Sequence, residues 1–501
     1  MKYTSTRDTQ TRVSSKQAIS QGISVEGGLF VPTELPYISQ LEMITLRDLN
    51  YLQRAEYILG GFLSDYSENE LRDCIQGAYG SGRFDDDDNA APLKEVGHKD
   101  YFLELWHGST CAFKDMALQL LPYLLTYAAK SCSQGRETVI LVATSGDTGK
   151  AALEGFKDVA GTKIMVFYPQ DGVSPAQKLQ MITQEGENVA VCAIKGNFDD
   201  AQTAVKKIFT SPEVNKALLK NNMRFSSANS INWGRLAPQI VYYFSAYADL
   251  LKQHALKSTD DKVNIVVPTG NFGNILAAYY AKYMGLPVNK LICASNSNKI
   301  LTDFINTGIY DKNREFLTTI SPSMDILISS NLERLLYHLC NGESERVKGW
   351  MSSLEQKGVY EVEDDVKAIL NKLFYAGFCS EEQTESEIYR LFKDFGYLAD
   401  THTAVASYVC GEYRRKTGDK LPCIIASTAS PFKFSSSVLE ALGNETEGLT
   451  EFEKIDALAQ LTRVPAPEPL KGLENKAVRF EDVCTDETMI QTVFNMLGIK
   501  E

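Results

Sequence analysis

The chain has 501 residues, of which 44% are hydrophobic and 23% charged, as is typical of a globular protein with two or three domains. Its formal net charge of −13 argues against binding to nucleic acid or to an anionic membrane. The sequence has no signal-peptide core at its N-terminus and no run of about 18 apolar residues, and its ten cysteines are scattered without a metal-binding spacing. We therefore expect a cytoplasmic protein without disulfides, a metal site or a membrane partner.

The first 95 residues are expected to form an accessory N-terminal domain. Apolar residues at helical spacing predict helices over residues 17–21, 41–62 and 67–79. The four consecutive carboxylates at 85–88 could bind a cation. They lack the ligand spacing of a calcium loop, however, so a solvated linker is the favoured interpretation.

From Tyr101 onward, strands and helices are expected to alternate. The continuous apolar, β-branched run at 137–143 predicts a strand that is buried on both faces. Further strands are expected over residues 163–168, 188–194, 263–267 and 423–427. Short helical crossovers between such strands imply parallel sheets with helices on both faces. Peripheral helices are expected over residues 324–340, 343–356, 364–375 and 381–395, and the tail from Pro465 is expected to wrap the surface.

Lys114 lies in the polar segment His107-Gly-Ser-Thr-Cys-Ala-Phe-Lys-Asp115, which precedes an apolar helical run at 116–127. A lysine at the start of a helix can aim its amine at a bound carbonyl and form a Schiff base. Most lysines are simply solvated, because burying an ammonium group is costly. On this segment alone, a surface lysine is the favoured interpretation.

The segment Pro268-Thr-Gly-Asn-Phe-Gly-Asn274 connects a predicted buried strand to a predicted helix. Glycines let the backbone approach a ligand, and the N–H groups of a helix N-terminus attract phosphate. The spacing is G-x-x-G, which matches neither the dinucleotide motif nor the P-loop. An ordinary tight turn is the alternative, although the two asparagines add side-chain donors.

Two further segments carry candidate ligand-binding side chains. The first, Ser227-Ala-Asn-Ser-Ile-Asn-Trp-Gly-Arg235, precedes an apolar helix. Its donors suit the binding of a phosphate or a carboxylate, and the alternative is a capped helix start with Arg235 exposed. The second, Asp400-Thr-His-Thr-Ala404, predicts that Asp400 caps a helix. His402 suits either a binding site or a packing role.

Several polar loops, at 144–149, 268–274 and 427–433, are predicted at the C-terminal ends of parallel strands, where open α/β sheets bind ligands. Lys114, a phosphate-binding loop and a loop with hydroxyl groups could meet there. A lysine for an aldehyde, a helix N-terminus for a phosphate and a partner for a ring nitrogen are what a pyridoxal phosphate (PLP) site requires. The combination therefore changes the interpretation of Lys114 from a surface lysine to a candidate catalytic residue.

The sequence resembles the threonine synthase family in its longer bacterial and fungal form. The resemblance rests on residues 107–115, 144–149, 227–235, 270–274 and 400–404, together with Tyr3, Ser5, Thr6, Arg7 and residues 27–32. The resemblance spans nearly the whole chain. It implies a fold-type II PLP-dependent enzyme, with a two-lobed α/β architecture of parallel sheets similar to tryptophan synthase β. It also implies an accessory region over 1–95 and a catalytic core over 96–501. The smaller lobe is expected at approximately 136–235 and the larger lobe at 96–135 plus 236–501.

The resemblance assigns roles to individual residues. Lys114 falls on the Schiff-base lysine, and the hydroxyl of Thr428 falls on the partner of the pyridine nitrogen. The expected cofactor contacts are Lys114, Phe113, Gly270, Asn271, Phe272, Gly273, Asn274 and Thr428. The expected substrate contacts are Ser145, Asp147, Thr148, Asn229, Ser230, Asn232, Arg235 and Lys433.

The reaction implied is the conversion of O-phospho-L-homoserine and water to L-threonine and phosphate, by a monomer or a homodimer. Ser109, Cys111, Ser430 and Phe432 stand where the family commonly has proline, leucine, histidine and alanine. These departures keep open a related lyase that gives 2-oxobutanoate. A serine or threonine dehydratase of the same fold is less favoured, since it would leave the phosphate-binding candidates unused. The alternative from another class is a catalytically silent PLP-binding protein.

Overall fold

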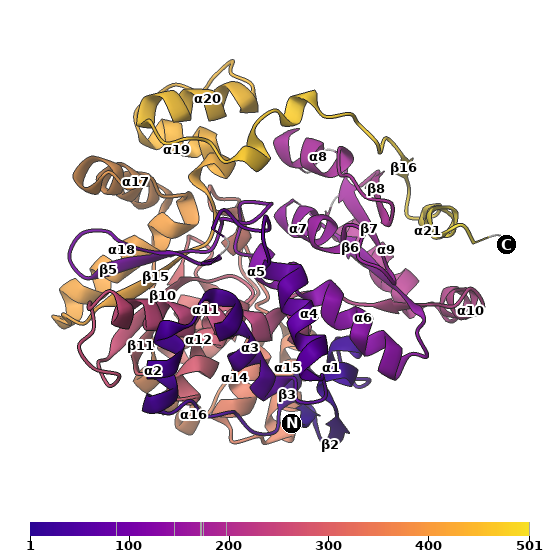
Figure 1. Cartoon of the computed structure of the whole chain (residues 1–501), viewed down its shortest axis with the longest axis horizontal. Helices are drawn as coiled ribbons and strands as arrows, with labels where there is room; N and C mark the ends of the chain where they lie inside the picture. Colours follow the sequence, from indigo (N-terminus) through magenta and orange to yellow (C-terminus); the bar gives the residue numbers. More distant parts are fainter. Residues whose placement is uncertain (87, 145, 171–172, 174, 197, 500–501) are drawn as a thin grey trace.

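The computed structural model describes residues 1–86, 88–144, 146–170, 173, 175–196 and 198–499. Its larger sheet has the strand order β14-β11-β10-β15-β5-β4, of which β11, β10, β15 and β5 are labelled in Figure 1. The first five strands are parallel and β4 is antiparallel. They span Phe374–Phe378 (β14), Val288–Ser295 (β11), Val263–Pro268 (β10), Cys423–Ser427 (β15), Asp100–Glu104 (β5) and Leu93–Glu95 (β4).

The smaller sheet has the order β16-β8-β7-β6-β9, and all its strands are parallel. They span Val483–Cys484 (β16), Val189–Ile194 (β8), Thr162–Pro169 (β7), Glu137–Ala143 (β6) and Met223–Ser226 (β9). The predicted strands of both sheets are confirmed within a residue or two. The predicted surface tail also contributes a strand, because β16 pairs with β8 and extends this sheet. The expected lobe boundaries remain a prediction.

The N-terminal region packs on the larger sheet's layer of helices. Its small antiparallel sheet consists of β1 (Tyr3–Ser5), β2 (Asp8–Val13) and β3 (Phe30–Pro32), and its helices are α1 (Ser15–Gln21), α2 (Gln40–Asp48), α3 (Tyr51–Phe62) and α4 (Glu68–Tyr79). The single helix expected over 41–62 is two helices. Asn50 ends α2 because it caps α3. Its side chain accepts from the Gln53 N–H, and the Gln53 side chain accepts from the Asn50 N–H in return.

Helices around the two sheets complete the core. They are α5 (Asp115–Leu118), α6 (Leu121–Cys132), α7 (Asp147–Phe156), α8 (Pro175–Ile182), α9 (Phe198–Thr210), α10 (Pro212–Lys220), α11 (Trp233–Lys252), α12 (Gly273–Tyr283), α13 (Ile300–Thr307), α14 (Leu332–Leu339), α15 (Ser344–Lys357), α16 (Asp364–Leu373), α17 (Glu381–Phe395), α18 (Thr401–Thr417), α19 (Ser435–Ala441), α20 (Glu451–Thr462) and α21 (Met489–Leu497). Helix α11 is buried over nearly its whole length. Among the described residues, no helix is long and apolar enough to cross a membrane.

The region from 320 to 400 departs most from expectation. The helix predicted over 324–340 begins only at Leu332, and a loop with the short 3-10 helix Pro322–Met324 precedes it. The helix predicted over 364–375 ends at Leu373, and Phe374–Phe378 continues as strand β14 at the edge of the larger sheet. A small antiparallel pair, β12 (Ile309–Asp311) and β13 (Val359–Glu361), was also not predicted. The loop matters for function because it carries Ser323 into the site described next.

Candidate active site

Lys114 lies directly before α5 in the loop that follows β5, and its side chain is only 11% exposed. Its Nζ is 3.8 Å from Asp147 Oδ2 and 3.4 Å from Ser323 Oγ. Burial lowers the pKa of Lys114; Asp147 opposes this shift, whereas Lys433 and Arg235 add to it. The sequence-based alternative of a solvated surface lysine is therefore wrong, because this amine faces other charged groups inside the fold.

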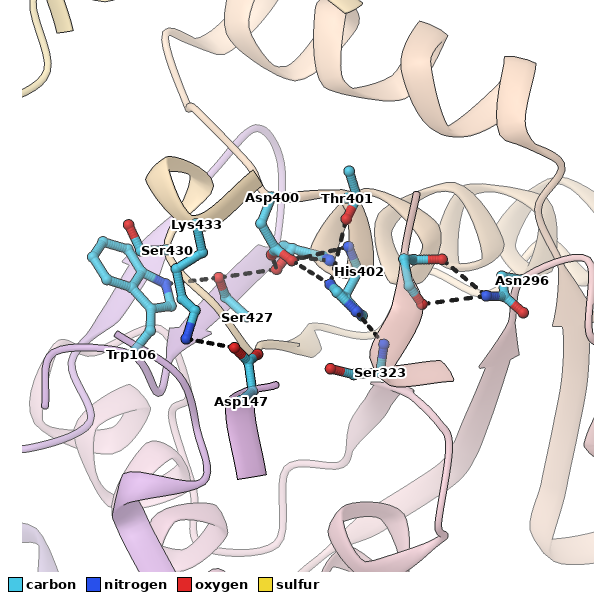
Figure 2. Close-up of polar contacts among 12 residues, drawn as sticks. Trp106, Asp147, Asn296, Ser323, Asp400, Thr401, His402, Ser427, Ser430 and Lys433 are labelled. Atoms are coloured by element: carbon cyan, nitrogen blue, oxygen red, sulfur yellow. Dashed lines mark hydrogen bonds and ion pairs between the residues drawn. The ribbon is translucent and has the colours of Figure 1, made fainter. Parts of the chain in front are cut away.

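Asp147 joins the two sheets through a buried ion pair. It is the first residue of α7, after β6 of the smaller sheet, while Lys433 follows β15 of the larger sheet. Lys433 Nζ lies 2.8 Å from Asp147 Oδ1, as Figure 2 shows, and also donates to the Thr110 carbonyl at 2.8 Å. Burial disfavours the charge of Asp147, but Lys433 and Lys114 outweigh it and hold its pKa well below the ordinary value. Burial alone would lower the pKa of Lys433, but the neighbouring carboxylate of Asp147 outweighs burial, so the pKa of Lys433 is raised.

The loop at 270–274 has the features of an anion site. Helix α12 starts after Phe272, which adopts a left-handed conformation (φ 64°), and among the described residues no side chain caps its first turn. Asn274 is buried; its Oδ1 accepts from Tyr243, whereas its Nδ2 has no partner among the described atoms. A Cβ on Gly270 would come within 2.5 Å of the Ser323 carbonyl oxygen, so this position has room only for glycine. Free N–H groups and a free amide donor thus remain available to an anion.

Arg235 is buried in the first turn of α11 and is 5% exposed, so the alternative of a capped helix with Arg235 exposed is wrong. Its Nη1 donates to the Ala228 carbonyl at 3.0 Å, and its Nε has no partner among the described atoms. It forms no ion pair within the described part of the chain, and burial lowers its pKa to about 10. A buried guanidinium without a counter-ion is the kind of group that an anionic ligand would satisfy.

The rest of the 227–235 segment divides into two parts. Asn229 is exposed and Ser230 is half-buried, so both can reach a ligand. Asn232 caps α11 and donates its amide hydrogens to the carbonyls of Ile19 and Ser227, so its donors are committed within the fold.

Asn331 Nδ2 donates to the carbonyls of Ser230 (3.3 Å) and Asn271 (3.1 Å). Asn331 therefore links this segment to the loop at 270–274.

Thr428 and Phe113 belong to two loops that run side by side. The Phe113 N–H donates to the Thr428 carbonyl at 2.8 Å, and Ala112 and Ala429 form an isolated antiparallel bridge. Thr428 is 6% exposed, and the Phe113 ring centroid lies 5.1 Å from Lys114 Nζ. Both predicted cofactor contacts thus lie beside the lysine. Of the other predicted contacts, Thr148 is in the first turn of α7, and Ser145 is outside the described residues.

The four departures from the family pattern lie around these loops. Cys111 and Phe432 are buried in one apolar cluster, so a small and a large side chain share that space. Ser109 Oγ accepts from Gln119 Nε2 at 2.9 Å, which a proline could not do. The Ser430 N–H donates to the Cys111 carbonyl at 3.0 Å. All four positions contribute to holding the loops together.

Sequence reasoning missed Ser323 and left His402 undecided. His402 is buried at the start of α18, where Asp400 caps the helix as predicted. His402 Nε2 accepts from the Ser323 N–H at 3.1 Å, and its Nδ1 lies 2.8 Å from Asp400 Oδ2 (Figure 2). The histidine therefore supports the loop that contacts Lys114. The dipeptide Ser321-Pro322 and the polar run 329–331 were signals that this segment is a loop.

Comparison with known proteins identifies the family. A model described as threonine synthase N terminus matches residues 2–79, and one described as threonine synthase, C-terminal, matches residues 403–493. Threonine synthase of Pseudomonas aeruginosa is 38% identical over 442 residues, which cover 88% of this chain and 90% of that protein. This chain belongs to the threonine synthase family. Human threonine synthase-like 1 is 40% identical over 475 residues, which cover 91% of this chain but only 62% of that protein.

Solved structures of this family agree with the fold. PLP-bound threonine synthase from Brucella melitensis superposes with a TM-score of 0.88 at 35% identity, with both chains fully covered. Yeast threonine synthase gives a TM-score of 0.88 at 32% identity and 99% coverage of both chains. The predicted fold class is therefore confirmed as the fold-type II α/β architecture with parallel sheets.

Proposed function

We propose that this protein is a PLP-dependent threonine synthase, which converts O-phospho-L-homoserine and water to L-threonine and phosphate. The observation that carries the proposal is that a buried amine lies near two groups that could each bind an anion: the uncapped start of α12 and the Arg235 guanidinium. Lys114 lies beside Ser323, and Ser323 packs against Gly270 of the uncapped helix start. Arg235, the second anion-binding group, is close enough to lower the pKa of Lys114. An enzyme with a phosphorylated cofactor and a phosphorylated substrate needs two such groups.

The residues present fit PLP. Lys114 would hold the cofactor aldehyde, and the N–H groups at the start of α12 with Asn274 Nδ2 would hold its phosphate. Thr428 would face the ring nitrogen, as the family resemblance implies. A neutral hydroxyl there, rather than a carboxylate, would leave that nitrogen largely uncharged.

Arg235, Asn229 and Ser230 are the proposed contacts for the substrate phosphate, since the guanidinium has no other anion to neutralise. Asn232 is left out because its donors are used within the fold. Asp147 and Thr148 begin α7 on the opposite, smaller sheet and are proposed to hold the amino-acid part of the substrate. Lys433 would then act on the substrate indirectly, by keeping Asp147 ionised.

When bound, PLP supplies an electron sink that stabilises negative charge on the substrate carbons. The remaining steps need a base that can take and return protons near the substrate. Lys114 suits this role because burial lowers its pKa, which increases the neutral fraction of the amine near neutral pH. The cationic Arg235 would retain phosphate after it leaves the substrate, so that the departing charge stays neutralised.

The test is to identify the organic product when the purified protein is incubated with PLP and O-phospho-L-homoserine. Threonine and phosphate in equal amounts are expected, with no product from Lys114→Ala and unchanged product from Lys94→Ala, a mostly exposed lysine. Formation of 2-oxobutanoate instead would replace the proposal with the phosphohomoserine lyase. Absence of phosphate release under all conditions would reject both activities. The expected cytoplasmic location and the monomer or homodimer state stay predictions.

A further inference from the structure

Lys114 has two candidate partners, and they are not equivalent. Asp147 is engaged by Lys433 at 2.8 Å, and the remaining oxygen is 3.8 Å from Lys114 Nζ, beyond hydrogen-bond distance. Ser323 Oγ, at 3.4 Å, is the hydrogen-bond acceptor that the described residues offer to this amine. Asp115, the adjacent residue, turns its carboxylate toward Thr110. The released lysine amine would therefore rest on a neutral hydroxyl.

The backbone of Ser323 is held by an oriented histidine. Because the Ser323 N–H donates to His402 Nε2, that nitrogen carries the lone pair, and the ring proton is on Nδ1, where it can be donated to Asp400. Asp400 in turn accepts from the N–H of His402 and from the N–H and hydroxyl of Thr403. A histidine whose orientation is fixed by a helix cap thus anchors the serine.

The rest of the loop is held from its other side. Asp325 Oδ1 accepts from Asn296 Nδ2 (2.8 Å), Asn298 Nδ2 (2.8 Å) and Thr319 Oγ1 (2.7 Å). Asn296 also donates to Ser321 Oγ. Since the loop is fixed at both ends, Ser323 can keep its side chain at one distance from Lys114.

We propose that Ser323 Oγ is the resting partner of the Lys114 amine, and that His402 is a positioning residue which acts through Ser323. This inference rests on the proposed function for its catalytic consequence. A neutral acceptor keeps the amine within reach of the substrate without the charge of a second carboxylate, which would favour the protonated form. The charged groups close enough to influence the pKa of Lys114 are Asp147, Lys433, Arg235 and Asp115.

The first test uses the protein without cofactor, so it does not depend on turnover. Competitive labelling with acetic anhydride, read by mass spectrometry of the Lys114 peptide, gives the pH at which this amine becomes reactive. An accepted hydrogen bond stabilises the ammonium, so Ser323→Ala should move the Lys114 profile to lower pH by about one unit. Ser323→Thr should restore it. Ser352→Ala, at an exposed serine of α15, should leave it unchanged. Overlapping profiles for Ser323→Ala and the wild type would overturn the proposal.

The second test uses the PLP-loaded enzyme. His402→Leu removes the acceptor for the Ser323 N–H and should lower kcat by about tenfold or more while KM changes less than about twofold, since the substrate contacts remain. His402→Gln can supply an acceptor near the position of Nε2 and should recover most of kcat. The control is His338→Gln, at the histidine that bonds Tyr280 away from the site. Equal losses in the leucine and glutamine variants, or a loss confined to KM, would reject the positioning role.

The two tests separate this inference from the proposed function. If the wild-type protein forms no product from O-phospho-L-homoserine but Ser323→Ala still shifts the Lys114 labelling profile, the proposed function fails and the Ser323 contact stands. If product forms normally but the profile does not move, the contact fails and the function stands. Circular dichroism of each variant establishes that it is folded.

Discussion

Replacing Lys433 with methionine should leave a buried carboxylate without its nearest cation. The side chains of Lys433 and Asp147 are 4% and 9% exposed, so water cannot replace the lost partner. Breaking such a pair from one side typically costs about 3–5 kcal/mol. Lys114 remains 3.8 Å from Asp147 and compensates in part, so we expect the free energy of unfolding to fall by about 2–4 kcal/mol.

The double variant Asp147→Asn, Lys433→Met tests the reason for that loss. If the cost arises from an uncompensated charge, neutralising Asp147 should make the double variant more stable than Lys433→Met alone. Lys471→Met serves as the control, because its pair with Glu468 is at the surface and should contribute less than about 1 kcal/mol.

Urea unfolding followed by far-UV circular dichroism, at several pH values, measures these differences. The pKa of Asp147 is depressed in the folded protein, so its contribution is present above the unfolded value near 4 and is lost as the pH falls through the folded value. Lys433→Met should therefore destabilise the protein at pH 7 more than at low pH. If Lys433→Met costs no more stability than Lys471→Met, or if the double variant is the least stable of the set, an uncompensated charge on Asp147 is not the cause of the loss.

Three further substitutions test separate parts of the site. Gly270→Ala should weaken PLP binding at least tenfold, because the new Cβ would lie 2.5 Å from a backbone oxygen. The control is Gly349→Ala, which should leave PLP binding unchanged because nothing lies within 4 Å of its new Cβ. Spectral titration with PLP measures both affinities. Arg235→Met should raise KM for O-phospho-L-homoserine about tenfold or more, because the proposed contact with the substrate phosphate is lost. It should not reduce the thermal stability of the cofactor-free protein, because it removes a buried charge that has no counter-ion among the described residues. Burial raises the pKa of Asp115 to about 6, so the folded state binds a proton more tightly than the unfolded state between pH 4 and 6. The free energy of unfolding of the wild type relative to Asp115→Asn should thus fall by about 3 kcal/mol as the pH rises from 4 to 7 in urea titrations, and a flat difference would contradict the assigned pKa.

The sequence was most informative where a buried strand ends in a polar loop. The continuous apolar run at 137–143 and the strand at 423–427 both have the predicted positions, and the loops after them carry Asp147 and Lys433. Open α/β sheets bind ligands outside the C-terminal ends of their strands, so these two loops could be expected to lie near Lys114 even though their strands belong to different sheets. Asp147 lies 2.8 Å from Lys433 Nζ and 3.8 Å from Lys114 Nζ, so the two loops and Lys114 are close together.

The sequence was least informative where tertiary contacts decide the local structure. The segment before Leu332 has enough apolar residues to suggest a helix, but Pro322 and the hydrogen bonds to Asp325 hold its start as a loop. The contact between His402 and Ser323 joins residues 79 positions apart, which no local pattern reveals. Arg235 could not be assigned as buried either, because its environment is formed by the packing of α11.

We propose that Lys114 is the amine that binds PLP in this fold. Borohydride reduction of the PLP-loaded protein, followed by mass spectrometry of its peptides, tests this directly by making the link between cofactor and lysine permanent. We predict one modified peptide, carrying the phosphopyridoxyl group on Lys114, and loss of that peptide when inorganic phosphate competes at high concentration. Modification of a different lysine, or an equally strong visible absorption band in Lys114→Ala, would show that Lys114 does not bind the cofactor.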